Sequence, residues 1–488
     1  MKHIVSLSLI LVPSAFFATT ARAQTGTITQ LFSFACPNTQ VGVCPDGSRP
    51  NALIQASDGN FYGAAQVTIV GSSNPQGGTL FKLTRDGQFT RLFTFTANAS
   101  GLYVNGDNPA SGLLEANDGF LYGTTGDGGA QNQGVLFRIG KDGKDFSVVH
   151  DFCSAANCAD GSGPGGLTLG HDGNLYGTTG ISLETGMDTC QSMGGCGTIF
   201  RFTPPGTFTT LHQLNGTTDG EGPSGIIQGS DGDFFGTISN GVFRFASGGQ
   251  FTVLATFPLF KFLPTISDGG LFQASNGKLY GPLLRVAEDE AQFFEIDTSG
   301  SGFQELPQFG TLASDFAIGN TVQASDGNLW TALVEVGTAP GSIIAMSPAN
   351  GAVVQNFSLN GANGSLPEAG VIQGADGKIY GTAALGGTLS NGKTPVGTIW
   401  SLDAGLPAPS PAAAAFNPAS GAVGSTVLIR GNNFIGTTAV AFNGVGATFQ
   451  VLNVNFIRAT VPSGAPTGPI TVTNAGGTTE SPTNFTVE

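Results

Sequence analysis

Aspartates followed by glycine are the potentially reactive residues that recur most regularly in this chain. A calcium loop needs several oxygen donors at alternate positions, and only Asp231 and Asp233 begin such a series. An Asp-Gly pair between two β-prone runs instead predicts a tight hairpin turn, because glycine accepts the positive φ of the reversal. We therefore expect turns, with no metal and no other cofactor, at Asp58, Asp118, Asp172, Asp231, Asp326 and Asp376.

Histidines give little indication of catalysis. His150 and His212 occupy the same position of neighbouring repeats, where other repeats have Phe93 or Ala255, which predicts packing or a satisfied hydrogen bond. His171 stands beside one of the Asp-Gly turns. No Gly-x-Ser-x-Gly elbow and no apparent Ser, His and Asp set is present, so we predict no catalytic residues.

Acidic residues in the insertions are the remaining candidates for chemistry. Paired carboxylates can hydrolyse a glycoside or hold a cation, but acidic runs are more often solvated loops. An arginine and a tyrosine in neighbouring insertions are of a type that grips a sugar. The candidate ligand-binding residues are therefore Arg49, Tyr103, Asp127, Glu184, Asp188, Glu221, Glu288, Asp289 and Glu290.

The elements that carry these residues are short strands. Residues Leu113–Phe152 contain two hairpin signals in tandem, turning at Asn117–Gly119 and at Lys141–Gly143. Apolar, β-prone runs flank both turns, so the unit is predicted to be four antiparallel strands. Copies of this unit begin at Leu53, Leu113, Leu167, Ile226, Leu271, Thr321 and Val371.

The two ends of the repeat array complement each other. The seventh repeat stops after Gly397–Leu402 without a fourth strand, and Gly26–Phe34 resembles a fourth strand without a repeat. A ring closed by its own first strand explains both ends and leaves no exposed sheet edge. We predict an all-β, seven-bladed β-propeller with four-stranded blades; an open solenoid, the alternative, leaves Thr27–Phe34 unpaired.

This closure sorts the connections onto two faces of the ring. The turn face carries the Asp-Gly turns. The loop face carries the long insertions, all six cysteines and the recurring Gly-x-x-Pro segments at Gly47–Pro50, Gly106–Pro109, Gly161–Pro164, Gly220–Pro223 and Gly364–Pro367. Variable loops on one face of a rigid ring favour a binding face, with tolerated insertions as the alternative.

Composition indicates an exported acidic protein. Residues 1–23 of the 488 resemble a signal peptide, with a basic start, a short apolar run and an Ala-x-Ala site before Gln24; an uncleaved anchor is the alternative. We expect no transmembrane segment after cleavage. Loss of Lys2 and Arg22 leaves 16 basic and 33 acidic residues, a net charge of −17, which argues against nucleic acid as a partner.

Cysteines pair by proximity along the chain. In an oxidising compartment, three disulfides are the natural interpretation. Zinc is the alternative, but no pair has the spacing and no second pair or histidine accompanies it. We predict disulfides within the pairs Cys36 and Cys44, Cys153 and Cys158, and Cys190 and Cys196.

Two family resemblances cover the mature chain. The blocks SDGNxYGTT, GTLFKLT and DGxFTxLxxF recur in fixed order over Thr27–Asp403 and resemble the GloVer repeat of bacterial surface proteins. Beyond a Pro-rich linker, alternating strands such as GSTVLIRGNNF resemble an IPT/TIG domain, an immunoglobulin-like β-sandwich. The predicted domains are a signal peptide (1–23), the propeller (24–403), a linker (404–411) and the sandwich (412–488).

These resemblances imply an exported surface protein, and the repeat family supplies no known catalytic residues. We predict a non-catalytic binding or scaffold protein, outside a bacterial cell or at its surface, with the periplasm as the alternative location. Its expected partner is a polysaccharide or another surface protein, met at the loop face. The alternative functions are a propeller glycan hydrolase or lyase that uses the acidic loop residues, and a purely structural spacer.

Overall fold

The structure is a computed structural model that describes residues 26–36, 42–70, 77–109, 111–180, 196–239, 241–256, 270–285, 290–307, 320–334, 340–389 and 394–488. The predicted signal peptide lies outside these residues. So do the candidate residues Glu184, Asp188, Glu288 and Asp289, the side chain of Glu290, and Cys190.

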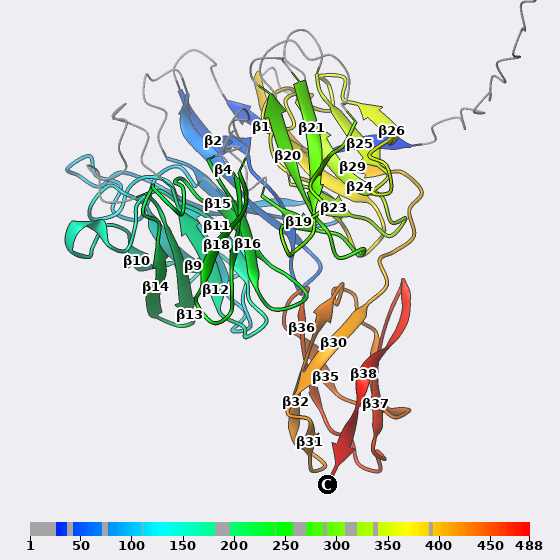
Figure 1. Cartoon of the computed structure of the whole chain (residues 1–488). Helices are drawn as coiled ribbons and strands as arrows, with labels where there is room; N and C mark the ends of the chain where they lie inside the picture. Colours follow the sequence, from blue (N-terminus) through cyan, green and yellow to red (C-terminus); the bar gives the residue numbers. More distant parts are fainter. Residues whose placement is uncertain are drawn as a thin grey trace, which may run out of the picture.

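In the described residues, seven antiparallel sheets form blades around a central axis (Figure 1). The strands of a blade follow one another outward from the axis, except that in blade 1 the first two strands both pair with the third. Blade 1 contains β2 (Gly42–Pro50), β3 (Ile54–Gln55), β4 (Phe61–Val70), β5 (Thr79–Leu83) and β6 (Phe89–Thr94). Blade 2 contains β7 (Leu114–Glu115), β8 (Leu121–Thr125), β9 (Val135–Ile139) and β10 (Ser147–Asp151). Blade 3 contains β11 (Pro164–Leu169), β12 (Leu175–Thr179), β13 (Thr198–Thr203) and β14 (Thr207–Gln213).

The remaining blades repeat this order. Blade 4 contains β15 (Ser224–Gln228), β16 (Phe234–Ile238), β17 (Gly241–Phe245) and β18 (Phe251–Thr256). Blade 5 contains β19 (Phe272–Gln273), β20 (Leu279–Arg285), β21 (Glu290–Ile296) and β22 (Gln304–Glu305). Blade 6 contains β23 (Val322–Gln323), β24 (Leu329–Leu333), β25 (Ser342–Met346) and β26 (Val353–Ser358). Blade 7 contains β27 (Ile372–Gln373), β28 (Ile379–Ala383), β29 (Thr394–Asp403) and, from the N-terminus, β1 (Thr27–Cys36).

Ring closure occurs through β1, which pairs antiparallel with β29 from Thr27 opposite Asp403 to Cys36 opposite Thr394. The first described strand therefore supplies the outermost strand of the last blade. This pairing covers the sheet edge that blade 7 would otherwise expose. The predicted seven-bladed propeller, closed by the N-terminal strand, is confirmed.

The Asp-Gly turns are held by their own aspartate. In blade 1, Asp58 accepts hydrogen bonds from the Asn60 amide (3.1 Å) and from the Tyr62 hydroxyl (2.7 Å), and Gly59 takes φ 78°. The same tyrosine bond to aspartate recurs at Tyr122 (2.8 Å), Tyr176 (2.9 Å) and Tyr380 (2.7 Å). These carboxylates cap turns, as their sequence context predicts.

Stacked rings join the outer strands of neighbouring blades. His150 of blade 2 stacks on Phe208 of blade 3, with ring centroids 3.7 Å apart. His212 of blade 3 stacks in the same way on Phe251 of blade 4, at 4.7 Å. In blade 1 the equivalent residue, Phe93, stacks on Phe146 of blade 2 at 3.8 Å. The predicted packing role of both histidines is confirmed.

The C-terminal residues form a two-sheet sandwich (Figure 1). Its first sheet, in spatial order, is β30 (Ala412–Asn417), β32 (Thr426–Asn432), β36 (Phe456–Thr460) and β35 (Phe449–Val451). Its second sheet is β31 (Ser420–Gly421), β38 (Gly477–Val487), β37 (Gly468–Asn474), β33 (Ala439–Phe442) and β34 (Val445–Gly446). Ile429, Ile457, Ile470 and Phe485 are fully buried between the sheets, so the sandwich has its own core.

Disulfides and one helical turn lie in the connections between strands. Disulfides join Cys36 to Cys44 and Cys153 to Cys158, which are the first two predicted pairs. Cys196 of the third predicted pair is also disulfide-bonded. The described helical structure is one 3₁₀ turn, η1 (Ala156–Cys158), and no helix in these residues is long and apolar enough to span a membrane.

Candidate functional site

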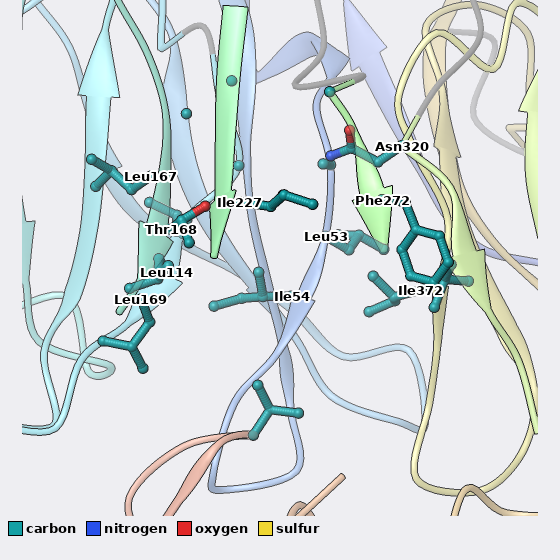
Figure 2. Close-up of a pocket in the computed structure, with 18 of the residues that line it drawn as sticks. Leu53, Ile54, Leu114, Leu167, Thr168, Leu169, Ile227, Phe272, Asn320 and Ile372 are labelled. Atoms are coloured by element: carbon teal, nitrogen blue, oxygen red, sulfur yellow. The ribbon is translucent and has the colours of Figure 1, made fainter. Parts of the chain in front are cut away.

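A central channel runs along the propeller axis, walled by the innermost strand of each blade. In each blade one partly exposed residue of the inner strand faces this channel. Figure 2 shows Ile54, Leu114, Ile227, Phe272 and Ile372 around this common space. With Thr168 and Val322 they line a mostly apolar cavity of about 500 Å³.

The C-terminal sandwich covers the turn-face end of this channel. Asn453, Val454 and Asn455, from the connection between β35 and β36, line the cavity together with the inner strands, and a loop of the sandwich lies beneath the channel in Figure 2. The Asn453 side-chain amide donates to the Asn117 side-chain oxygen at 2.8 Å. Because Asn117 belongs to an Asp-Gly turn of blade 2, the sandwich docks on the turn face.

The linker also contacts the turn face. The Pro407 carbonyl accepts hydrogen bonds from Ser325 Oγ (2.6 Å) and from Gln373 Nε2 (3.2 Å). Both donors belong to the inner hairpins of blades 6 and 7. The linker and the sandwich together therefore occupy the turn-face side of the axis.

A ring of carboxamides joins the blades around the channel. Each member accepts a hydrogen bond from a backbone amide in the preceding blade: Gln323 from Ser275 (2.8 Å) and, across the closure, Gln55 from Ala375 (2.9 Å). The side-chain amide of Gln323 also donates to the Gly327 carbonyl of its own turn, at 2.9 Å. We call Gln55, Glu115, Gln228, Gln273, Gln323 and Gln373 the glutamine ring.

Glu115 is the charged member of the glutamine ring. It is 5% exposed and accepts from the Ser57 amide (2.7 Å), the Ser57 hydroxyl (2.6 Å) and Lys141 Nζ (2.5 Å). Lys141 also donates to the Ser57 hydroxyl at 2.7 Å, and its charge balances that of the carboxylate. This buried carboxylate therefore holds two blades together.

The loop-face candidate Arg49 makes an ion pair across the ring closure. Its guanidinium lies 3.3 Å from a carboxylate oxygen of Glu368, which is in blade 7. The neighbouring Pro50 carbonyl accepts from the Thr382 hydroxyl of that blade at 3.0 Å. Arg49 thus has a structural partner, and its role in ligand binding stays a prediction.

Tyr103 and Asp127 are brought together between blades 1 and 2. The Gly129 amide donates to the Tyr103 carbonyl (2.9 Å), and the Asp107 amide donates to the Asp127 carbonyl (2.8 Å). Asp107 is 7% exposed, and burial, aided by the charge of Asp127, raises the pKa of Asp107 to about 6. Asp107 was not among the residues predicted from the sequence, because its surroundings come from distant residues: the Gly77 amide, 30 residues earlier, donates to it at 2.6 Å.

Glu221, the remaining described candidate, lies apart from this group, between blades 3 and 4. Its backbone carbonyl accepts from both the amide and the hydroxyl of Ser239, each at 2.9 Å. In the part of the chain that the structure describes, no group of three or more His, Cys, Asp or Glu side chains is placed to hold a metal ion. The described carboxylates of the loop face are therefore spread over several blades.

The Gly-x-x-Pro segments of the loop face pack neighbouring blades together. In each case the proline lies against a glycine just before or within the third strand of the preceding blade. Gly78 has φ 135°, and no space remains for a Cβ beside Pro109. The same contact joins Gly134 to Pro164, Gly197 to Pro223, Gly341 to Pro367 and Gly397 to Pro50. Recurrence of these segments therefore reflects packing rather than ligand contact.

Comparison with solved structures finds distant similarities. An oligogalacturonate lyase from Vibrio parahaemolyticus is 10% identical, with 77% of this chain and 93% of that chain covered and a TM-score of 0.45. A luciferin-regenerating enzyme is 11% identical, with 78% and 95% covered and a TM-score of 0.39. A Bacteroides thetaiotaomicron protein is 31% identical over only 16% of this chain and 18% of its own, with a TM-score of 0.15.

Comparison with protein families gives the assignment. No curated protein matches the chain. The Gloeobacter/Verrucomicrobia repeat matches residues 14–241 and 185–393, and the IPT/TIG domain matches residues 411–487. These matches confirm both resemblances read from the sequence. The chain belongs to the Gloeobacter/Verrucomicrobia repeat family and ends in an IPT/TIG domain.

Proposed function

We propose that this chain is an exported, non-catalytic binding or scaffold protein that contacts a polysaccharide or another surface protein through its loop face. The observation that carries the proposal is the position of the IPT/TIG domain. This domain and its linker cover the turn-face end of the channel. The opposite face of a rigid ring is left to present its loops, which is where binding residues usually lie.

Export is supported by the disulfides and by the repeat family. Disulfides persist in oxidising compartments and are rare in the cytosol, and two described pairs tie down loop-face connections. We place the protein outside a bacterial cell or at its surface.

A fixed apolar loop on the loop face supports a partner role. Asn98 Oδ1 accepts from the Ser100 amide (2.9 Å) and the Leu102 amide (3.0 Å), which fixes the start of this loop. Leu102 and Val104 are 59% and 43% exposed on either side of Tyr103. An aromatic side chain between exposed apolar residues, on a loop with few conformations to lose, is typical of a contact surface.

The test is a screen of the oxidised protein against bacterial and plant polysaccharides and a bacterial envelope fraction, measuring binding and reducing-end release together. We expect saturable binding without release, weakened about tenfold by Tyr103→Ala. Val354→Ala is the matched control, because Val354 is 50% exposed on the outer strand of blade 6.

Two results would contradict the proposal. Release of reducing ends that is lost on Asp127→Ala would establish the glycan hydrolase or lyase instead. Absence of binding to every polysaccharide and to the envelope fraction would leave the spacer role.

A further inference from the structure

A second cavity, of about 340 Å³, lies at the junction of the propeller and the IPT/TIG domain. We call it the junction cleft. On the propeller side it is lined by inner-strand and turn residues of blades 3 to 5, including His171 and Ser230. On the other side it is lined by Arg430 and Asn432 of β32, among others. Arg430 alternates with the buried Ile429 along β32, so its side chain leaves the sandwich core and faces the propeller.

Arg430 is a half-buried cation that forms no ion pair with a described carboxylate. Among the described residues, no aspartate or glutamate oxygen lies within ion-pair distance of its guanidinium, in a chain that carries 33 acidic residues against 18 basic ones. Burial alone lowers the pKa of Arg430 from its ordinary value. Removing an arginine from water without a partner is costly, so the cleft has an unmet preference for an anion.

Other acidic groups near the cleft are already engaged. Asp172, beside His171, accepts from the Asn174 amide (3.0 Å) and the Tyr176 hydroxyl (2.9 Å). Asp231 accepts from the Asp233 amide at 3.1 Å. Their bonds stay within their own turns, and neither carboxylate pairs with Arg430.

The apolar channel adjoins the cleft. Thr168, Leu169, Ile227, Phe272 and Asn455 line both cavities, and Figure 2 shows Thr168, Leu169, Ile227 and Phe272 around the channel. Water in an apolar cavity makes few hydrogen bonds, so its displacement by an apolar group is favourable. The guanidinium and the apolar wall thus meet at one place.

We propose that the junction cleft and the adjoining end of the channel bind a small amphiphilic carboxylic acid. Its carboxylate pairs with Arg430, because a guanidinium presents paired donors that match a carboxylate. Its apolar body lies against Ile227 and Phe272. This site is separate from the loop face, so its test does not depend on the proposed function.

The first test uses the unmodified, full-length protein. Isothermal titration calorimetry with octanoate at pH 7.5 is compared with octan-1-ol, which has the same apolar chain and no charge. We expect saturable one-to-one binding of octanoate and at least tenfold weaker binding of octan-1-ol.

Variants then assign the charge to one residue. Arg430→Gln is expected to weaken octanoate at least tenfold and to leave octan-1-ol unchanged, whereas Arg430→Lys keeps most of the octanoate affinity. Arg458→Gln is the matched control, since Arg458 is on neighbouring strand β36 and donates to Gln450 outside the cleft. Ile227→Ala is expected to weaken both ligands equally.

Three outcomes would overturn the proposal. They are absence of saturable octanoate binding to the unmodified protein, unchanged octanoate affinity in a folded Arg430→Gln variant, and an equal loss in Arg458→Gln. The last result would show that octanoate responds to diffuse surface charge. Comparison of the acid with the alcohol keeps the test decisive even where a variant folds poorly.

Discussion

Glu115 gives the sharpest test of how the blades hold together. Replacement by leucine removes the acceptor of the Ser57 amide and the partner of Lys141, whereas replacement by glutamine supplies the side chain that most other blades already use. Glu115→Leu should therefore destabilise the propeller more than Glu115→Gln, although leucine is the more apolar residue.

The magnitudes follow from exposure. An amide left without a partner costs about 1–3 kcal/mol, and a bond to a charged group contributes about 1.5–3 kcal/mol. Lys141 is 25% exposed and can turn to water, which places Glu115→Leu near 2 kcal/mol. Glu115→Gln keeps the bond from Ser57 and loses only charge, so about 1 kcal/mol or less is expected.

The assay is urea unfolding followed by tryptophan fluorescence. Both tryptophans, Trp330 and Trp400, are fully buried in the propeller, and residues 412–488 contain none. Lys144→Met is the matched control, because its ion pair with Asp142 is exposed in the same blade and should contribute little to stability. Equal destabilisation by the two Glu115 variants would refute the role assigned to the glutamine ring.

Three further predictions use other contacts. Burial lowers the pKa of His150, so the folded state resists protonation of this histidine. As the pH falls below about 6.5, the urea midpoint should therefore drop more in the unmodified protein than in His150→Phe. Parallel curves of midpoint against pH would contradict this prediction. Burial raises the pKa of Asp107 to about 6, so the ionised carboxylate destabilises the folded state at pH 7.5. Asp107→Asn should therefore stabilise the protein at that pH by about 1–3 kcal/mol, and this gain should vanish below about pH 4 in the same assay. A difference that does not depend on pH would argue against this prediction. Asn117→Ala removes the hydrogen bond to Asn453. Loss of about 1 kcal/mol of docking free energy should speed proteolysis of the 404–411 linker about fivefold. An unchanged rate would mean that this bond does not hold the IPT/TIG domain against the propeller.

Local patterns predicted the architecture because each repeat contains its own turns. The aspartate, the glycine and the tyrosine four residues after Asp58 lie within one hairpin, so their bond follows from spacing alone. Ring closure was predictable for a different reason. The seventh repeat lacks a strand that Thr27–Phe34 supplies, and an unpaired strand edge is unfavourable.

Contacts between blades were not predictable in the same way. A glutamine recurs at the position of Gln323 in most repeats. Its partner Ser275 is 48 residues away in the sequence, and only the ring geometry brings the two together. Arg49 and Glu368 are 319 residues apart, so a residue expected to contact ligand gave no indication of its ion pair. Arg430 was not identified because the sequence does not indicate which face of the sandwich meets the propeller.

The departure of blade 3 from the repeat bears on where the IPT/TIG domain docks. The linker bonds to blades 6 and 7, and blade 3 adds a local difference among otherwise similar turns. At the position of the glutamine ring, blade 3 has Leu169, which cannot accept the amide of Asn117 in the preceding turn. It is Asn117 that bonds to Asn453 of the IPT/TIG domain. The interruption of the ring and this docking contact therefore coincide in one sector of the propeller.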